Sequence, residues 1–150
     1  MPQSLSNILI HVVFSTKERR DLIDAGIEPE LHRYLASVCR ACGCPAHEVG
    51  GTGDHVHLIC TLGRTIAVGD LLEEIKKRSS KWIKTKGERY RLFSWQRGYG
   101  AFSIAHSQLA AARRYVARQK EHHARRNFKD EFLALLKRYD VAYDARYIWD

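Results

Sequence analysis

The stretch His55-Val56-His57-Leu58-Ile59-Cys60 has the composition of a β-strand. A strand directs residues two apart toward one face, so His55 and His57 are expected on one side and Val56 and Leu58 in a core on the other. Two neutral imidazoles on a rigid strand can hold a divalent metal ion if one or two oxygen ligands come from elsewhere. The stretch therefore predicts half of a metal site. Taken alone, it also allows a purely structural role for both histidines.

A second candidate motif lies within residues 107–123, which have helical composition and begin with the start signal Ser107. Tyr115 and Gln119 are four residues apart and share a helix face, which His122 continues one turn later. This face is displaced from the apolar stripe of the same helix. A tyrosine oxygen can act as a nucleophile, and a glutamine amide oxygen can complete a metal site.

Apolar periodicity predicts alternating strands and helices around these two motifs. The expected strands are residues 8–15, 46–51, 55–62 and 99–104, and the expected helices are residues 28–42, 68–85, 107–123 and 128–139. The order strand-helix-strand-strand-helix-strand is the ferredoxin-like split βαββαβ arrangement of an antiparallel sheet. We therefore expect an α+β fold with the Tyr115 helix and a C-terminal helix added, all in one domain, 1–150.

The net charge of +8 and the isoelectric point near 9.5 favour a polyanionic partner. An ordinary basic protein is the alternative. The side chains that we expect to contact DNA are Lys17, Arg19, Arg20, Lys77, Arg78, Lys81, Arg114, Arg118 and His122. The apolar run at residues 8–14 is too short to span a bilayer and lacks a signal-peptide pattern. The sequence therefore predicts a cytoplasmic protein with no membrane partner.

The four cysteines, Cys39, Cys42, Cys44 and Cys60, do not have the pattern of a disulfide framework. A zinc knuckle made by Cys39, Cys42, Cys44 and His47 is an alternative, but its spacing is irregular. Buried free thiols are the expected state.

Four motifs in register extend over nearly the whole chain. They are His11-Val-Val-Phe-Ser-Thr-Lys-Glu-Arg-Arg20, Gly53-Asp54-His55-Val56-His57-Leu58, Trp95-Gln96-Arg97-Gly98-Tyr99-Gly100-Ala101-Phe102-Ser103-Ile104, and Tyr115-Val-Ala-Arg-Gln119 with the Glu121-His122-His123 that follows. In order and spacing they resemble the single-tyrosine transposases of the HUH nuclease superfamily, which include the insertion sequence 200 type and the REP-associated enzymes.

The resemblance implies a metal-dependent tyrosine transposase that cleaves and rejoins single-stranded DNA through a 5′-phosphotyrosine. Tyr115 would be the nucleophile, and His55, His57 and Gln119 would hold Mg²⁺, with Mn²⁺ as a plausible substitute. The implied partner is single-stranded DNA that contains a hairpin. We expect a homodimer, since the family often takes the tyrosine helix from a partner subunit. The sequence does not decide between shared sites and a monomer.

Three other readings stay open. A non-catalytic single-stranded nucleic-acid-binding module could have the same ferredoxin-like fold and basic charge. A relaxase or replication initiator would use similar motifs in a longer chain. A domesticated HUH nuclease would keep the chemistry without a mobile element.

Overall fold

The computed structural model describes residues 2–150, and an antiparallel sheet forms its centre. The strands are β1 (Leu9–Ser15), β2 (Ala46–Gly51), β3 (His55–Thr61) and β4 (Gly100–Ile104). They lie in the order β2-β3-β1-β4, and β1 pairs with both β3 and β4. This order confirms the predicted α+β class and the ferredoxin-like split arrangement.

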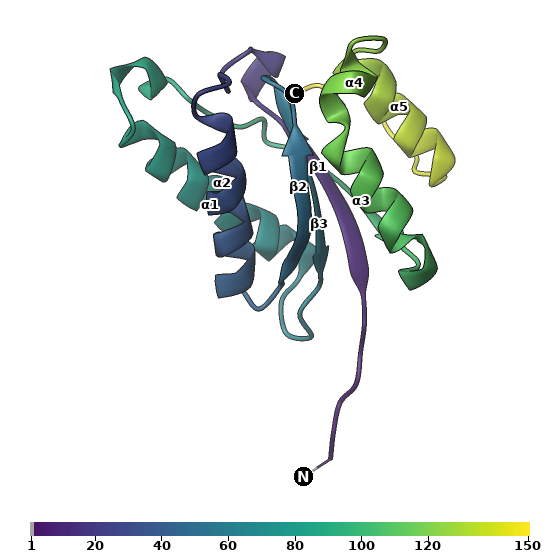
Figure 1. Ribbon diagram of the computed structural model, residues 1–150. Helices are drawn as coiled ribbons and strands as arrows, with labels where there is room; N and C mark the ends of the chain where they lie inside the picture. Colours follow the sequence, from purple (N-terminus) through teal and green to yellow (C-terminus); the bar gives the residue numbers. More distant parts are fainter. Residues whose placement is uncertain (1) are drawn as a thin grey trace.

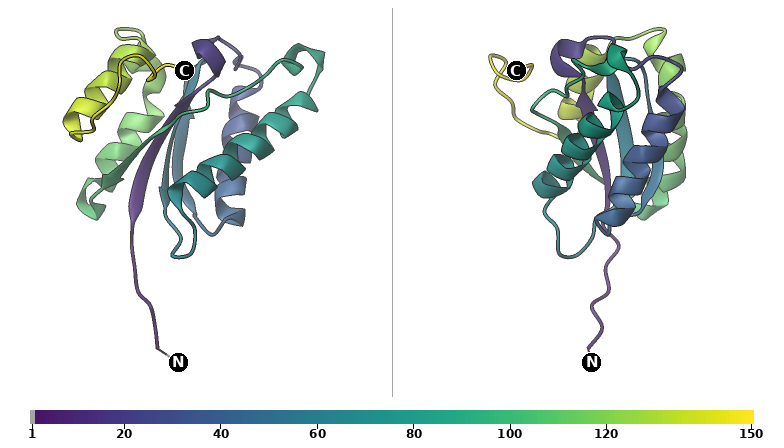
Figure 2. Two further views of the ribbon diagram at one scale, coloured as in Figure 1. Left: turned by 180° about the vertical axis from the view of Figure 1, so that it is seen from behind. Right: turned by 90° about the vertical axis from the view of Figure 1, so that its left-hand side faces the viewer.

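Helices cover both faces of the sheet, as Figures 1 and 2 show. On one face lie α1 (Glu28–Ala41) and α2 (Val68–Lys84). On the other lie α3 (Leu109–Ala117), α4 (Gln119–His123) and α5 (Phe128–Arg138). Short 3-10 helices are η1 (Lys17–Arg19), η2 (Glu88–Tyr90) and η3 (His106–Gln108). The sheet is therefore the middle of three layers.

Local sequence signals explain where several helices begin and end. Pro29 lies in the first turn of α1, where its missing N–H costs nothing, and Gly43 follows the helix with a φ of 74°. Helix α5 begins at Asn127, whose side chain accepts a hydrogen bond from the backbone N–H of Asp130 at 2.9 Å.

Every residue of β1 is buried, because each side of the sheet faces a separate apolar core. Ile10, Val12 and Phe14 pack with α1, α2 and the apolar side chains of β3. Val13 points the other way and packs against α5. The core residues on that side are Val13, Phe102, Phe128, Phe132, Leu135 and Leu136.

The predicted single helix over residues 107–123 is wrong. The structure divides it into η3, α3 and α4, with a break at Arg118 (φ −103°, ψ 26°). Helix α3 packs so closely on β2 that a Cβ added to Gly50 would lie 2.1 Å from the backbone oxygen of Val116. The break at Arg118 thus comes two residues after a close contact between α3 and β2. The apolar periodicity of residues 107–123 does not predict this contact.

The cysteines form no zinc knuckle among the residues described. All four are free, and Cys39, Cys44 and Cys60 are buried in the core beside α1. His47 instead makes a 2.7 Å hydrogen bond with the Thr61 hydroxyl. Within residues 2–150, the search for membrane spans finds no helix with the length and apolarity required to cross a bilayer.

Candidate metal and tyrosine site

His55 and His57 lie on the face of β3 that α3, α4 and α5 cover, and both are fully buried. Val56 and Leu58 point into the opposite core, as the two-residue period of the strand predicts. The two imidazole rings have centroids 5.1 Å apart. The predicted pairing of the histidines on one face is therefore confirmed.

The Nδ1 atom of each imidazole makes a hydrogen-bond contact with a neighbouring side chain. Nδ1 of His57 lies 2.7 Å from Nε2 of His11, and Nδ1 of His55 lies 2.7 Å from Oδ1 of Asp54 and 3.0 Å from the Thr52 hydroxyl. Such contacts fix the ring orientation and leave Nε2 facing inward. Burial lowers the pKa of His57 to about 4 and that of His11 to about 3. Neutral imidazole is the form that binds metal ions.

Tyr115 and Gln119 reach the same place from α3 and α4. The amide oxygen of Gln119 lies 2.9 Å from Nε2 of His55, although the two residues are 64 positions apart in the chain. The ring of Tyr115 lies 5.8 Å from that of His57 between centroids. Burial and the neighbouring Glu131 carboxylate hold the pKa of Tyr115 well above its usual value. The free phenol is therefore protonated at neutral pH.

Glu131 of α5 is a central member of the site that the sequence interpretation missed. Its carboxylate is 3% exposed, and Oε1 lies 2.8 Å from Nε2 of His57. Oε2 accepts hydrogen bonds from the Tyr115 hydroxyl and, at 3.2 Å, from the Gln119 amide. The sequence does contain a signal for this residue. Glu131 is a charged residue on the apolar stripe of α5, at a position that a leucine would fill.

His123 joins this group, whereas His122 does not. Nε2 of His123 lies 3.1 Å from Oε1 of Glu131. His122 instead contacts the ring of Tyr115 in a tilted arrangement, with ring centroids 4.7 Å apart. Within the described part of the chain, the donor atoms that could hold a metal ion belong to His55, His57, His123 and Glu131, all within 4.8 Å of one another. Imidazole nitrogens with a carboxylate oxygen are suitable ligands for a divalent ion.

A pocket of about 300 Å³ between α3 and α5 leads to this group. Tyr115, His11 and Glu131 line its inner end, and Arg126 and Arg138 lie along its walls. Tyr115 is half-buried, so its ring is reachable from the pocket. The pocket lining therefore combines two guanidinium groups with the phenol of Tyr115.

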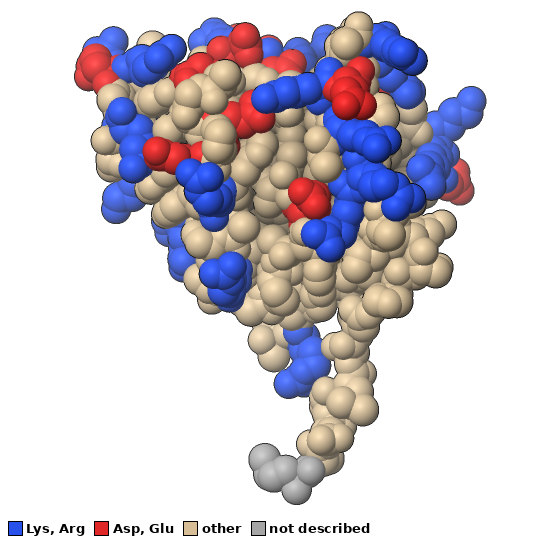
Figure 3. Space-filling model, in the orientation of Figure 1, with Lys and Arg blue, Asp and Glu red and all other residues tan. Residues whose placement is uncertain are grey.

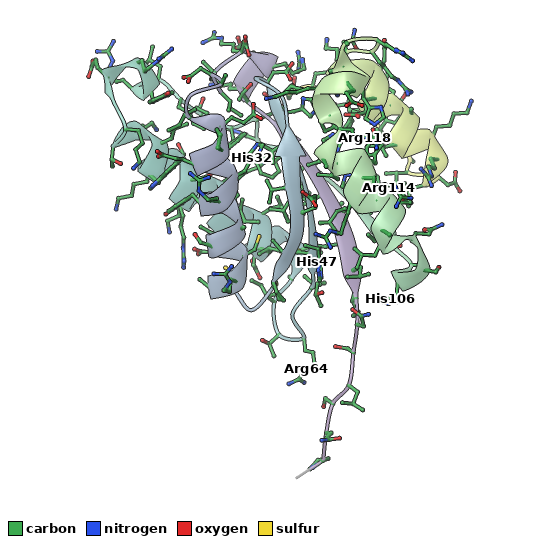
Figure 4. The ribbon with its side chains drawn as sticks, in the orientation of Figure 1. His32, His47, Arg64, His106, Arg114 and Arg118 are labelled. Carbon is green, nitrogen blue, oxygen red and sulfur yellow. The ribbon has the colours of Figure 1, made fainter. Side chains whose placement is uncertain are left out.

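The side chains predicted to contact DNA do not form one surface. Arg114 and Arg118 are exposed on the side of the sheet that carries α3 (Figure 4), where cationic groups gather over α3 and α4 (Figure 3). Lys77, Arg78 and Lys81 lie on α2, across the sheet from Tyr115. Three further predicted contacts, Lys17, Arg19 and Arg20, lie near the end of β1, and His122 lies on α4 beside Tyr115.

Comparisons with known proteins agree with this architecture. A protein from Deinococcus radiodurans R1, provisionally described as a transposase, superposes with a TM-score of 0.61 at 16% identity, covering 77% of this chain and 95% of its own. A REP-associated tyrosine transposase solved bound to a REP hairpin superposes with a TM-score of 0.55 at 15% identity, covering 77% and 68%. These two likenesses concern the fold. A search of curated proteins gives no significant match.

The family comparison covers more than half of the sequence. Residues 4–119 match the family described as transposase IS200 like, a range that includes β1 to β4, α3 and the residues His55, His57, Tyr115 and Gln119. The chain therefore belongs to the IS200-like transposase family.

Proposed function

We propose that this transposase cleaves and rejoins single-stranded DNA, with Tyr115 as nucleophile and a divalent metal ion held by His55, His57 and Gln119. One observation carries the proposal: the amide oxygen of Gln119 lies 2.9 Å from Nε2 of His55, while Tyr115 lies beside His57. Two motifs from separate parts of the chain thus meet in one buried place. That is the arrangement required for a nucleophile to act next to a bound cation.

In the cleavage step the Tyr115 oxygen attacks the scissile phosphorus, and the bond from phosphorus to the 3′ oxygen breaks. The phenol loses its proton and the departing 3′ oxygen gains one, which leaves a 5′-phosphotyrosine and a free 3′-hydroxyl. A 3′-hydroxyl of a different strand end then attacks the phosphotyrosine in the reverse sense. A phenol, with a pKa near 10, leaves more readily than an aliphatic alcohol, so rejoining needs no external energy.

The metal ion would neutralise the negative charge that develops on the phosphate oxygens. We propose Mg²⁺ as the ion, with Mn²⁺ as a substitute that the imidazole ligands suit well. His11 and Asp54 hold the outer nitrogens of the two histidines, so both Nε2 atoms stay directed at the site.

The pocket beside Tyr115 supports a phosphodiester as the ligand. Guanidinium groups form strong charge-assisted hydrogen bonds with phosphate, and both Arg126 and Arg138 line this pocket. The REP-associated transposase of similar fold was solved bound to a REP hairpin, and we propose a hairpin-containing single strand as the partner here as well.

The test is a covalent-adduct assay with labelled single-stranded DNA from the flanks of the gene, in the presence of Mg²⁺ or Mn²⁺. The unaltered chain should form an adduct that resists denaturant. Tyr115→Phe should form none, while its DNA affinity stays within about threefold, because only one oxygen atom is removed. An undiminished adduct in Tyr115→Phe would remove this residue from the proposed mechanism.

A non-catalytic binding module of this fold is supported less well. RNA-recognition domains bind single strands on an open sheet face. Here α3, α4 and α5 cover the equivalent face, and the side chains beneath them are imidazoles, an amide and a carboxylate. A covered site lined by polar groups fits a catalytic role better than the stacking of bases on an open sheet.

A further inference from the structure

Glu131 occupies a position whose burial needs a functional explanation. Helix α5 docks on the sheet through Phe128, Phe132, Leu135 and Leu136, and Glu131 lies in the same stripe with 3% of its surface exposed. A buried carboxylate loses its hydration, which costs several kcal/mol unless charge or hydrogen bonds replace it. An apolar side chain would pack there at no such cost. In the structure the groups that replace its hydration are His57, His123, Tyr115 and Gln119.

All groups that surround the Glu131 carboxylate belong to the site described above. Oε1 lies 2.8 Å from Nε2 of His57, 3.1 Å from Nε2 of His123 and 3.7 Å from Nε2 of His55. Two ligands at right angles on one ion, each about 2.1 Å from it, are roughly 3 Å apart. The observed separations therefore match those of atoms that share a metal ion, without any large movement of the backbone.

The hydrogen bonding of His55 independently indicates a cation. A neutral imidazole has one N–H, and Oδ1 of Asp54, 2.7 Å from Nδ1, is positioned to accept it. Nε2 then presents a lone pair to the amide oxygen of Gln119 at 2.9 Å and to Oε1 of Glu131 at 3.7 Å. In that tautomer the Nε2 lone pair and the Gln119 amide oxygen are two acceptors 2.9 Å apart, and a positive ion bound to both would satisfy them.

We propose that Glu131 and His123 are direct ligands of the divalent ion together with His55 and His57, so that α5 supplies part of the metal centre. The inference rests on the proposed function, since it adds to the same site. It goes beyond the His55, His57 and Gln119 set by adding an anionic ligand and a third imidazole. The amide oxygen of Gln119 stays a ligand, and its amide nitrogen also positions the Glu131 carboxylate, to which it donates at 3.2 Å.

The proposed ligands also connect helix α5 to the sheet. Phe128 packs on the ring of His55 with centroids 4.7 Å apart, and Glu131 is one turn further along α5. An ion that bonds to Glu131 therefore links α5 to β3 directly. Metal binding should stabilise α5, because an ion that binds only the docked helix favours the docked state.

The experiment is calorimetric titration of the full chain with Mn²⁺ in the absence of DNA. Glu131→Gln keeps the shape of the side chain and removes the anionic ligand, so its affinity for Mn²⁺ should fall by about tenfold or more. His57→Ala should lose binding to a similar or larger extent. Asp130→Asn removes an exposed carboxylate from the same helix and is the matched control, with affinity expected to stay unchanged within about twofold.

A second readout is hydrogen exchange of α5 with and without Mn²⁺. The ion should slow exchange of residues 128–138 in the unaltered chain and in Asp130→Asn, but not in Glu131→Gln. If Glu131→Gln does not fold, hydrogen exchange of the unaltered chain still tests the proposal. The proposal is overturned if Mn²⁺ slows hydrogen exchange in β3 but not in α5.

The outcomes separate this inference from the proposed function. Glu131→Gln with parental Mn²⁺ affinity, alongside a clear loss in His57→Ala, would make Glu131 only a hydrogen-bond acceptor of Tyr115. That result overturns the inference and leaves the phosphotyrosine mechanism intact, because the mechanism is tested by the covalent adduct. Parental affinity in both variants would overturn the metal site as a whole.

Discussion

At the scale of single residues, Gly50 sets the distance between the tyrosine helix and the sheet. It pairs with His57 in the β2–β3 register, and its missing side chain makes room for the backbone oxygen of Val116. Any Cβ at this position would lie 2.1 Å from that oxygen. Because Val116 follows Tyr115 directly, the contact also determines where the phenol lies.

Gly50→Ala should displace α3 and impair adduct formation by about a hundredfold, since catalysis is sensitive to shifts of about 1 Å. Gly98→Ala is the matched control, because a Cβ at Gly98 meets nothing within 4 Å. The measurement is the rate of covalent adduct formation on single-stranded DNA. Equal rates for the two variants would contradict the role given to Gly50.

His57→Ala should lower the stability of the fold as well as metal binding. His57 is fully buried and bonded to His11 and Glu131, so its removal takes away the partner of buried His11 and one of the hydrogen bonds of Glu131. We expect the free energy of unfolding, measured with urea in the absence of metal, to fall by about 1–3 kcal/mol. His47→Ala, which removes one half-buried hydrogen bond, should cost less. A larger loss in His47→Ala would contradict this account.

Four of the six residues that meet in the candidate site could be singled out from the sequence, and the physical reason is local spacing. His55 with His57, and Tyr115 with Gln119, are neighbours within one strand or within consecutive helical turns. Glu131 belongs to a different helix, and only tertiary packing brings it to the histidines. The sequence favours His122 over His123, because an unbroken helix would place His122 on the face of Tyr115 and Gln119, whereas the structure breaks the helix at Arg118.

At the scale of elements, α5 depends on its N-terminal cap. Asn127 accepts a hydrogen bond from the Asp130 backbone N–H at 2.9 Å, and the apolar stripe of α5 then packs on Val13 and Phe102. The sequence predicts this helix and the sheet order well, because capping and periodicity are local signals. It does not predict the division between α3 and α4, which accompanies the contact of Val116 with Gly50.

Asn127→Ala should lower the free energy of unfolding by about 1 kcal/mol, because it leaves a helix N–H without its acceptor. Asn127→Asp keeps an acceptor at the same place and should stay close to the unaltered chain. Urea denaturation compares the three proteins. Equal stability of the alanine and aspartate variants would show that the cap does not hold α5.

At the scale of the whole molecule, positive charge is distributed on both sides of the sheet, but the site opens on one side only. Arg114 and Arg118 share the α3 side with Tyr115, whereas Lys77 and Lys81 lie on α2 across the sheet. The six side chains of the candidate site lie close together within one chain. The homodimer stays a prediction, which light scattering can test.

The double change Arg114→Glu with Arg118→Glu should weaken binding of single-stranded DNA by about tenfold or more, and it should reduce the dependence of binding on salt. Lys77→Glu with Lys81→Glu makes the same change in net charge on the far side. We expect that variant to bind within about threefold of the unaltered chain. Equal losses of affinity in the two double variants would indicate that net charge, and not the α3 side, determines DNA binding.

Single-stranded DNA with a hairpin should bind about tenfold or more tightly than the same sequence fully paired, and the affinity should fall steeply with salt. A flexible strand can bend to bring one phosphate to the pocket beside Tyr115, whereas a duplex keeps its backbone in a rigid form. Fluorescence anisotropy at several salt concentrations measures both effects. Equal affinity for the two forms would favour a generic basic binder.

The most direct measurement of the central claim is mass spectrometry of the covalent adduct after digestion of protein and DNA. The account predicts one modified peptide, with a 5′-phosphorylated nucleotide attached to the oxygen of Tyr115 and a free 3′-hydroxyl on the other DNA fragment. Attachment to a different residue, or cleaved DNA ends with no protein attached at any stage, would contradict the assignment of Tyr115 as the nucleophile.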